Sequence, residues 1–435
     1  MIHKLPSKST IRSWLASPQA PLVTLCLLAI VGGVWIRSQA LDYPSFMQLD
    51  EHHFVEAARA MLEGHPDSND HPPLGKLLIA AVLSVSKDGP IAWRTSSLWF
   101  GFGSILLART FAKRLFRDPR AGWLAGVFVA IDGFFIAYSR LALIDGVLVA
   151  MMLGAATLSL SDRRWSWILS GTLIGLAASV KFTGIVMLVP VALAIALRAG
   201  TFRRFFTTML AMCLAVVGAY WIVGTIAGTL GHVDQPWLYA WKDTRSDALN
   251  HLGTVGRAHP MTSRWYTWFL PETLVNFGFV LTRDGSIRML SMLGNVLLWW
   301  SSPLCVGAGL VIGVRSAVRI AMGKADDETS VRGRIVDALR SEPMRTWGLL
   351  FVFWIAPLVP WMISDRDSYA YHYMPTYAFG LVAVAGWLSK AFARKPTWSI
   401  AVLGVIVAVS AFYAPLWGQL PVGYAGLDAR LFLWR

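Results

Sequence analysis

The stretch from Leu74 to Arg120, LGKLLIAAVLSVSKDGPIAWRTSSLWFGFGSILLARTFAKRLFRDPR, decides how this chain is arranged. It starts with an apolar piece of 13 residues (74–86), continues with an apolar run (91–112) and ends with a basic group (113–120). Thirteen residues rise about 20 Å as an α-helix, which is short of a hydrocarbon core of about 30 Å. The run at 91–112 is therefore long enough to cross a membrane, whereas the piece before it is not.

The composition indicates a polytopic helical membrane protein. The chain has 435 residues, a mean hydropathy of +0.53, 21 Trp and 15% charged residues. Its apolar runs are separated by short basic loops, as in membrane-spanning bundles. The net charge of +14 does not indicate nucleic-acid binding, because Lys and Arg occur in small groups at the ends of apolar runs.

The cysteines and the first apolar run carry no redox or processing signal. Cys26, Cys213 and Cys305 lie within apolar segments, so we expect neither a disulfide framework nor a zinc site. The run from Pro21 to Ile36 follows a basic start and lacks a small-residue cleavage site. We therefore expect a retained anchor rather than a signal peptide.

The distribution of basic residues predicts the topology. If 74–86 does not cross, 22 of the 39 Lys and Arg fall in inside segments; if it crosses, the group at 113–120 moves outside and the positive-inside pattern breaks. We therefore expect eleven spans, a cytoplasmic N-terminus, an outside C-terminus and a helix at 74–86 in the outer interface. The expected spans are 21–36, 91–112, 121–138, 141–160, 166–180, 182–198, 205–228, 289–314, 346–363, 374–389 and 398–416.

These spans divide the chain into three parts. Residues 1–228 form an N-terminal transmembrane module with a first outer loop at 37–90, residues 229–288 form a large outer loop, and residues 289–435 form a C-terminal transmembrane region. The inside segment 315–345 has the composition of a solvated linker. We find no internal repeat and no separate soluble domain.

The first outer loop concentrates ionisable side chains. Asp50 and Glu51 precede a helical pattern with one apolar face. Either these acids cap a surface helix, or an ionised carboxylate here takes a proton from a nucleophile. The acids and histidines of this cluster are Asp50, Glu51, His52, His53, Glu56, Glu63, His65, Asp67, Asp70 and His71, and the residues on the apolar face are Phe54, Ala58, Met61 and Leu62.

Charged residues at the ends of spans each allow two interpretations. Arg140 is either an interfacial anchor paired with Asp145 or a group that holds an anionic headgroup, which suits the planar fork of arginine. Lys181 lies between two apolar runs, so it either reaches the outer interface or binds a ligand. The prolines of HPPLGK fix a turn that starts the next helix, which makes His71 and Lys76 either interfacial anchors or site residues.

Simple motif matches do not identify a reaction. The segment YHYMP (371–375) has the composition of an interfacial aromatic belt. The chain has no GxxxxGK[ST] or GxSxG motif, and its histidines lack the spacing of a helical zinc site. The sequence DRD at 365–367 matches an Asp-x-Asp metal–nucleotide motif, but it lies in a short turn and is a weak candidate.

Six blocks taken together resemble the protein O-mannosyltransferases. They are LDEHHF (49–54) with HPPLGK (71–76), SRLALID (139–145), GLAASVKFTG (175–184), HPMTSRWYTW (259–268), LGNVLLWW (293–300) and YHYMP (371–375). Each block is weak by itself, but all six follow the order of the family and cover most of the chain.

The resemblance implies an all-α polytopic membrane protein with the GT-C fold: a bundle of about 11 transmembrane helices with amphipathic helices at its outer face. Its donor would be mannose on a polyprenyl phosphate, and its acceptor a Ser or Thr hydroxyl of a protein or peptide, met during secretion. The chain departs from the family pattern in two ways, and the first of them points to a bacterial-type enzyme of the inner or plasma membrane, with its active site facing outside or the periplasm. The large loop has no room for the soluble domain of eukaryotic members, and Val296 replaces a family proline.

The resemblance also assigns the site. Asp50 would be the base that activates the acceptor hydroxyl, with Glu51 positioning either Asp50 or the acceptor. A lipid phosphate leaves as an anion and needs cations more than a general acid. In-line attack would invert the anomeric centre of the sugar. No nucleotide takes part, so we expect no metal or other cofactor. The residues expected to hold the donor are His71, Lys76, Arg140, Lys181, Arg264, Tyr371 and His372.

Two alternatives remain open at this point. A GT-C transferase of another lipid-linked sugar, acting on a lipid or glycan, would share HPPL and an outer acid, although SRWYTW and YHYMP favour the mannosyl branch. A transporter or flippase would place charged or helix-breaking residues at mid-membrane. Asp132 and Gly133 are the one weak hint of that second arrangement.

Overall fold

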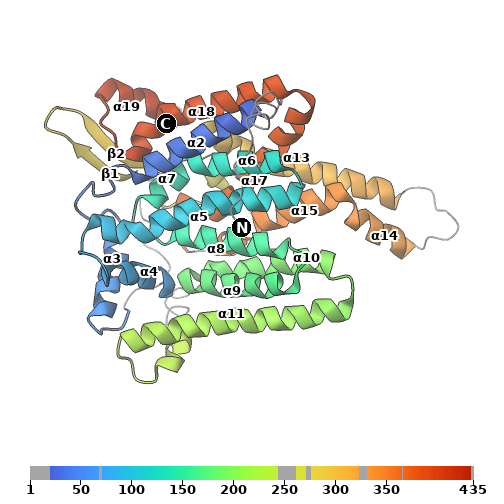
Figure 1. Cartoon of the computed structure of the whole chain (residues 1–435), viewed down its shortest axis with the longest axis horizontal. Coiled ribbons are helices and arrows are strands. Elements are labelled where there is room, and N and C mark those ends of the chain that lie inside the picture. Colours follow the sequence, from blue (N-terminus) through green and yellow to red (C-terminus); the bar gives the residue numbers. More distant parts are fainter. Residues whose placement is uncertain are drawn as a thin grey trace, which may run out of the picture.

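A computed structural model describes residues 20–67, 71–242, 261–270, 276–322, 331–364 and 366–432. Long helices lie side by side in a bundle (Figure 1). The helices are α2 (Ala20–Ser38), α3 (Glu51–Leu62), α4 (Leu74–Leu83), α5 (Pro90–Phe116), α6 (Pro119–Ile131), α7 (Gly133–Ser139), α8 (Asp145–Ser159), α9 (Arg164–Val180), α10 (Leu188–Ala199), α11 (Phe202–Leu230), α13 (Val296–Ala321), α14 (Val331–Arg340), α15 (Glu342–Ile355), α16 (Val359–Ile363), α17 (Met374–Arg394), α18 (Pro396–Gly418) and α19 (Tyr424–Leu431).

Shorter elements lie at one end of the bundle. Helices α3, α4 and α19 gather there with a hairpin of two antiparallel strands, β1 (Asn276–Leu281) and β2 (Ile287–Ser291) (Figure 1). Four 3₁₀ helices occur in the described part of the chain: η1 (Phe182–Met187), η2 (Pro236–Leu238), η3 (Trp265–Phe269) and η4 (Ala370–Tyr373).

Six helical segments of the described residues are long and apolar enough to cross a membrane, which makes the protein an integral multi-pass membrane protein. The number becomes seven if α6 and α7, bent by 60° at their junction, count as one broken span. The six segments are Ala20–Ser38, Phe182–Ala199, Phe202–Leu230, Val296–Ala321, Ala370–Arg394 and Pro396–Gly418. The count of eleven stays a prediction, since α8, α9 and α15 are helical but shorter, and α5, although it has 27 residues, is not among the six segments.

The prediction for Leu74–Ser86 agrees with the helix found there. Helix α4 ends at Leu83 after 10 residues. At 1.5 Å per residue it is about 15 Å long, half of a hydrocarbon core. A helix of this length is too short to span a membrane by itself, and its place at the outer interface stays a prediction.

Three expectations about secondary structure are wrong. The fold is not purely α-helical, because β1 and β2 form a hairpin. The span expected at 289–314 begins at Val296, since residues 289–291 belong to β2 and residues 292–295 connect that strand to the helix. The inside segment 315–345 is not a solvated linker throughout: α13 runs to Ala321, and α14 packs against α13. Residues 323–330 of that segment lie outside the described part.

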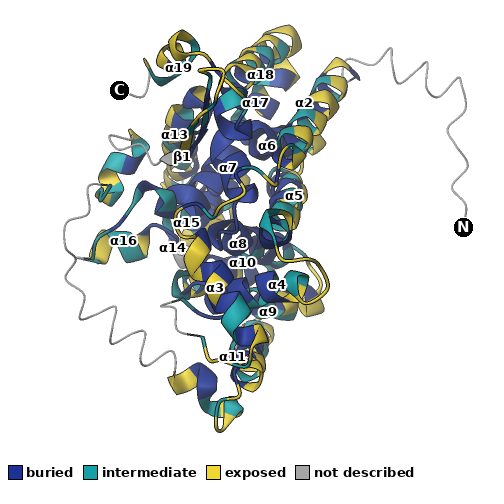
Figure 2. Ribbon diagram, turned by 90° about the vertical axis from the view of Figure 1, so that its left-hand side faces the viewer, coloured by how far each residue is buried: buried dark blue, intermediate teal, exposed yellow. Residues whose placement is uncertain are grey.

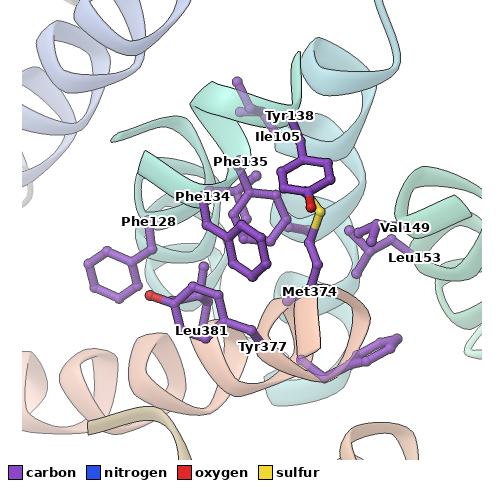
Figure 3. Close-up of a cluster of buried hydrophobic side chains, with 14 of the residues drawn as sticks. Ile105, Phe128, Phe134, Phe135, Tyr138, Val149, Leu153, Met374, Tyr377 and Leu381 are labelled. Atoms are coloured by element: carbon purple, nitrogen blue, oxygen red, sulfur yellow. The ribbon is translucent and has the colours of Figure 1, made fainter. Parts of the chain in front are cut away.

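The interior of the bundle is aromatic and apolar. In Figure 2 the buried residues face inward and the exposed ones form the outer surface. Phe134 and Phe135 of α7 pack against Tyr377 of α17 at the centre (Figure 3). The outer surface exposes large apolar side chains such as Leu304, which is 72% exposed and suits contact with lipid tails rather than water.

The break between α6 and α7 is closed by polar side chains. Asp132 accepts hydrogen bonds from Phe134 N (3.0 Å), Asn295 N (2.8 Å) and the Tyr377 hydroxyl (2.8 Å). The buried Arg37 of α2 donates to the carbonyl of Val129 (2.6 Å) and to that of Ala130. Backbone groups freed within a membrane bundle need such partners. Asp132 thus has a structural role, which removes the hint of a transporter.

Candidate active site

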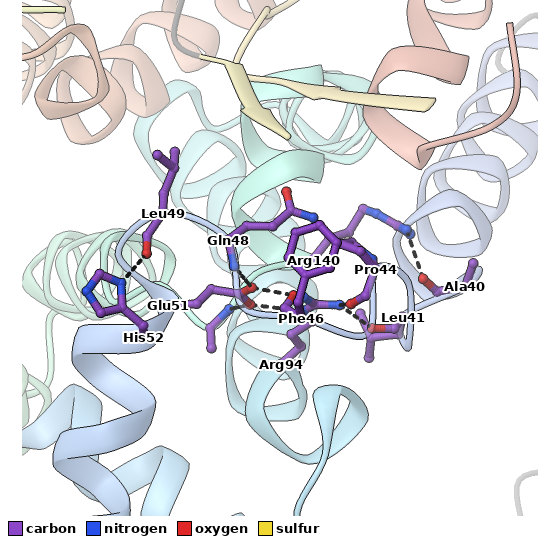
Figure 4. Close-up of polar contacts among 11 residues, drawn as sticks. Ala40, Leu41, Pro44, Phe46, Gln48, Leu49, Glu51, His52, Arg94 and Arg140 are labelled. Carbon is purple, nitrogen blue, oxygen red and sulfur yellow. Dashed lines mark hydrogen bonds and ion pairs between the residues drawn. The ribbon is translucent and has the colours of Figure 1, made fainter. Parts of the chain in front are cut away.

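Glu51 attaches the segment before α3 to the bundle (Figure 4). One carboxylate oxygen accepts hydrogen bonds from Arg94 Nε (2.9 Å) and Ala142 N (2.7 Å). The other accepts from Arg94 Nη2 (2.8 Å) and Gln48 N (2.9 Å). A carboxylate has about four acceptor positions, so all of them are occupied. Glu51 is therefore placed to fix its neighbour Asp50, not to accept a proton.

Arg94 extends this junction into the segment between α2 and α3. Its guanidinium also donates to the carbonyls of Leu41 (2.9 Å), Pro44 (3.1 Å) and Phe46 (3.3 Å), and the side chains of Arg94 and Glu51 are fully buried. Reasoning from the sequence missed Arg94. The available signal was an arginine close to the start of an apolar run, since a buried charge there requires a partner.

Asp50 stands at the surface next to this buried junction. It precedes α3, but its side chain makes no capping hydrogen bond, so the interpretation as a side-chain cap is wrong. Desolvation and the nearby carboxylate of Asp145 raise the pKa of Asp50, while His53, Lys181 and His52 oppose the rise. A carboxylate with a raised pKa is a stronger base, which suits proton removal from a hydroxyl.

Lys181 and Asp145 form a second buried ion pair. Lys181 Nζ lies 3.1 Å from Asp145 Oδ1, and both side chains are less than one-tenth exposed. The same Nζ lies 5.2 Å from the centre of the Tyr371 ring. The sequence reading that paired Asp145 with Arg140 is therefore wrong, because Asp145 pairs with the lysine of the next turn.

Arg140 instead terminates α2. Its guanidinium donates to the carbonyls of Ile36 (2.7 Å), Arg37 (3.2 Å), Gln39 (2.5 Å) and Ala40 (3.3 Å), at the C-terminal end of that helix. Cations are stabilised at this end by the helix dipole and the unpaired carbonyls. Arg140 is 2% exposed and lies outside the pocket described next.

A polar pocket of roughly 120 Å³ lies beside Lys181. Its positively charged side chains are Lys181 and Arg366, and His71 and His372 add imidazoles. Of the described residues that line it, Asp367 is the acid. The remaining walls are Phe182, Thr183, Trp361, Tyr369 and Tyr371. Cations among aromatic faces suit a phosphate joined to a sugar.

Aromatic contacts fix the YHYMP segment at this pocket. The rings of His372 and Trp361 lie 3.6 Å apart between centroids, and Tyr371 and His372 lie 4.3 Å apart. His372 Nδ1 is within hydrogen-bond distance of the Tyr369 backbone. The segment is thus more than an interfacial belt, because His372 is buried within the site.

Lys76 supports a wall of the pocket without lining it. Its ammonium pairs with Asp67 and donates to the carbonyl of His71, and the side chain is completely buried. His71 itself lines the pocket, with its ring 6.0 Å from that of Phe54. Lys76 therefore holds the His71 turn in place and does not reach the pocket.

Arg264 lies near the site but is exposed. Ser263 N donates to the Ser368 carbonyl (2.8 Å), and the Ser368 hydroxyl donates to the Ser263 carbonyl (2.8 Å). These bonds join the SRWYTW block to the segment that carries Arg366, although Arg264 does not line the pocket. Three further residues from the polar cluster and the motif blocks, His259, Pro260 and Asp70, lie outside the described residues.

Of the residues expected to hold the donor, the fold brings His71, Lys181, Tyr371 and His372 into one pocket. Sequence reasoning missed Arg366, Thr183 and Trp361. The sequence pattern drew attention to the acids of DRD at 365–367, whereas the arginine between them, Arg366, is one of the residues that line the pocket. Within the described residues, no group of three or more His, Cys, Asp or Glu is arranged to hold a metal ion.

Comparisons with known sequences agree on one family. A model of dolichyl-phosphate-mannose-protein mannosyltransferases matches residues 70–227, and a model of the C-terminal four-transmembrane region of protein O-mannosyltransferases matches residues 238–430. The polyprenol-phosphate-mannose–protein mannosyltransferase of Mycolicibacterium smegmatis is 26% identical over 261 residues, which are 52% of this chain and 46% of that protein. The chain thus matches about half the length of that relative.

Comparisons with solved structures confirm the GT-C type of fold. The S. cerevisiae protein O-mannosyltransferase Pmt1–Pmt2 complex bound to the sugar donor has a TM-score of 0.77 at 12% identity, covering 98% of this chain and 94% of the other. ArnT from Cupriavidus metallidurans has a TM-score of 0.55 at 15% identity, covering 94% and 76%. With two family models matching consecutive parts and the fold shared along its length, the chain belongs to the protein O-mannosyltransferase family.

Proposed function

We propose that the protein transfers mannose from a polyprenyl-phosphate carrier to Ser or Thr hydroxyls of polypeptides at the outer face of the membrane. The observation that carries this proposal is the polar pocket with Lys181 and Arg366, set beside an acid whose pKa is raised. Membership of the family supports mannose as the sugar, and the relatives' names supply the carrier and the acceptor class.

In this proposal the pocket holds the donor phosphate. Lys181 and Arg366 neutralise the phosphate, and the aromatic walls contact the sugar ring. As the bond between sugar and phosphate breaks, negative charge grows on the departing oxygen, and fixed cations stabilise that charge without reorganising. The ion pair with Asp145 orients Lys181 before the donor arrives.

Asp50 acts on the acceptor. The acceptor oxygen attacks the anomeric carbon, its proton passes to Asp50, and the electrons of the breaking bond leave with polyprenyl phosphate. Attack opposite the leaving group inverts the anomeric centre. Glu51 contributes by fixing Asp50, through its four hydrogen bonds to the bundle and the preceding loop. The leaving group is already an anion held by cations, so the scheme needs no metal or further cofactor.

The decisive test supplies purified protein with radiolabelled polyprenyl-phosphate mannose and a Ser/Thr-rich peptide. We expect label on the peptide, released by alkaline β-elimination as an O-linked sugar should be. A parallel reaction contains a lipid or glycan acceptor, and another contains a donor with a different sugar. Transfer only in those parallel reactions would overturn the proposal in favour of another GT-C transferase.

A further inference from the structure

Strand β1 is an edge strand whose outward main-chain groups have no partner among the described residues. Ile287 of β2 exchanges both its backbone hydrogen bonds with Val422 (2.8 and 2.9 Å), so these groups point away from β1. The residue opposite Ile287 in the β1–β2 hairpin is Leu281. In an antiparallel pair such residues alternate, so Leu281 and Phe279 direct their N–H and C=O groups away from β2. Among the described residues no other strand pairs with that edge.

The free edge lies at the end of the molecule that carries Asp50. Val422 occupies the far side of β2, which leaves β1 as the outer strand on the other side. Gly278 of β1 packs on Gln48, two residues before Asp50: a Cβ at this glycine would come within 2.4 Å of the Gln48 amide. Figures 1 and 4 show the hairpin next to the segment that leads into α3.

Gln48 supplies a second, independent observation. Its side chain is 3% exposed, and neither the amide nitrogen nor the amide oxygen has a hydrogen-bond partner. A buried, unsatisfied amide is destabilising, and such groups in native structures call for an explanation. An amide offers one donor side and one acceptor side, as a peptide group does. It therefore suits a main-chain partner.

We infer that the acceptor polypeptide binds in extended form along the free edge of β1, pairing with Phe279 and Leu281 while Gln48 bonds to its backbone. This inference rests on the proposed function, since it names the acceptor subsite of that reaction. Added strands take their affinity from main-chain hydrogen bonds. Such a site accepts many sequences but requires an unfolded segment, which presents the Ser or Thr hydroxyl to Asp50.

The first experiment probes the peptide backbone. Acceptor peptides with one Thr are N-methylated at one position at a time, and KM and kcat are measured with saturating polyprenyl-phosphate mannose. Loss of one main-chain hydrogen bond should raise KM about three- to tenfold. We expect this rise at every second position, because alternate residues of a strand face the edge. Equal effects at all positions, or none, would overturn the inference.

The second experiment changes the edge itself. Leu281→Pro removes an N–H that points away from β2 and takes no part in the β1–β2 ladder. Gln48→Leu removes the amide group and keeps a side chain of similar size. Both should raise the peptide KM and leave donor affinity unchanged, which also shows that the variant folds. Tyr424→Ala is the matched control, because this residue is 79% exposed on the helix beyond Val422. An unchanged peptide KM in both test variants would contradict an acceptor strand at β1.

The outcomes separate this inference from the proposed function. If no peptide receives mannose, the proposed function fails. If peptides receive mannose without alternation in the N-methyl series, only the β1 subsite fails. Dimer formation that Leu281→Pro abolishes, measured by mass photometry in nanodiscs, would assign the edge to a second copy of the chain and overturn the acceptor site.

Discussion

Two buried ion pairs lie close to the candidate base, and they differ in whether their charged groups can still bind a ligand. In the pair of Glu51 and Arg94, the carboxylate has four partners and both side chains are fully buried. In the pair of Asp145 and Lys181, a single contact of 3.1 Å joins the charges, and the lysine borders a pocket. The first pair is closed and holds structure together. The second is open to a ligand, and this difference separates structural charges from functional ones.

The largest effect on turnover should come from a substitution of Asp50, the candidate base. Asp50→Asn removes the base, so turnover should fall about 10²- to 10⁴-fold while the protein still folds and binds donor. Rates at saturating donor check this. Glu63→Gln is the control, because it removes an acid at the far end of α3. Near-normal turnover in Asp50→Asn would place the base elsewhere.

Breaking the ion pair of Glu51 and Arg94 should lower the stability of the protein more than its turnover. Glu51→Gln leaves the buried Arg94 without its counter-charge, and breaking a buried pair in this way typically costs about 3–5 kcal/mol. The free energy of unfolding should therefore fall strongly, and turnover should fall less than in Asp50→Asn. Unfolding monitored by cysteine accessibility in detergent measures the first quantity. Normal stability with lost turnover would mean that Glu51 acts in the reaction directly.

Removing the lysine of the open pair should affect the donor instead. Lys181→Met should weaken binding of polyprenyl phosphate by about 2–5 kcal/mol if the charge contact is desolvated. Binding titrations in nanodiscs measure this loss. Arg140→Ala is the comparison, since that guanidinium terminates α2 and should change stability more than donor affinity. The reverse ranking would restore Arg140 as the phosphate ligand.

The pH dependence gives the smallest and most specific effect. A base must be ionised, so turnover is lost as the pH falls through the pKa of Asp50, which lies above the ordinary value. Asp145 raises this pKa and Lys181 lowers it. The acid limb should therefore move to lower pH in Asp145→Asn and to higher pH in Lys181→Met. Shifts in one common direction would show that the limb reports another group.

The sequence was informative where a property depends on composition along the chain. Hydropathy and basic loops predicted a polytopic helical protein, and the six motif blocks indicated the family that the comparisons confirm. Residues 74–86 were predicted not to cross from their short length together with the distribution of basic residues, and the helix found there, α4, has 10 residues. The hairpin was missed, since residues up to 288 were read as a loop and residues from 289 as a span, a boundary that falls inside β2.

The tertiary structure alone decided which charges belong to the site. Arg140, Lys76 and Lys181 look alike in the sequence, as cations at the ends of apolar runs. Folding gives Arg140 the carbonyls of α2 and Lys76 the carboxylate of Asp67, while Lys181 stays at a pocket with Arg366. A buried charge takes whichever partner the packing brings near, and those partners come from distant segments. The sequence by itself determined which residues carry charge at the ends of apolar runs, and the fold determined which of them remain available to a ligand.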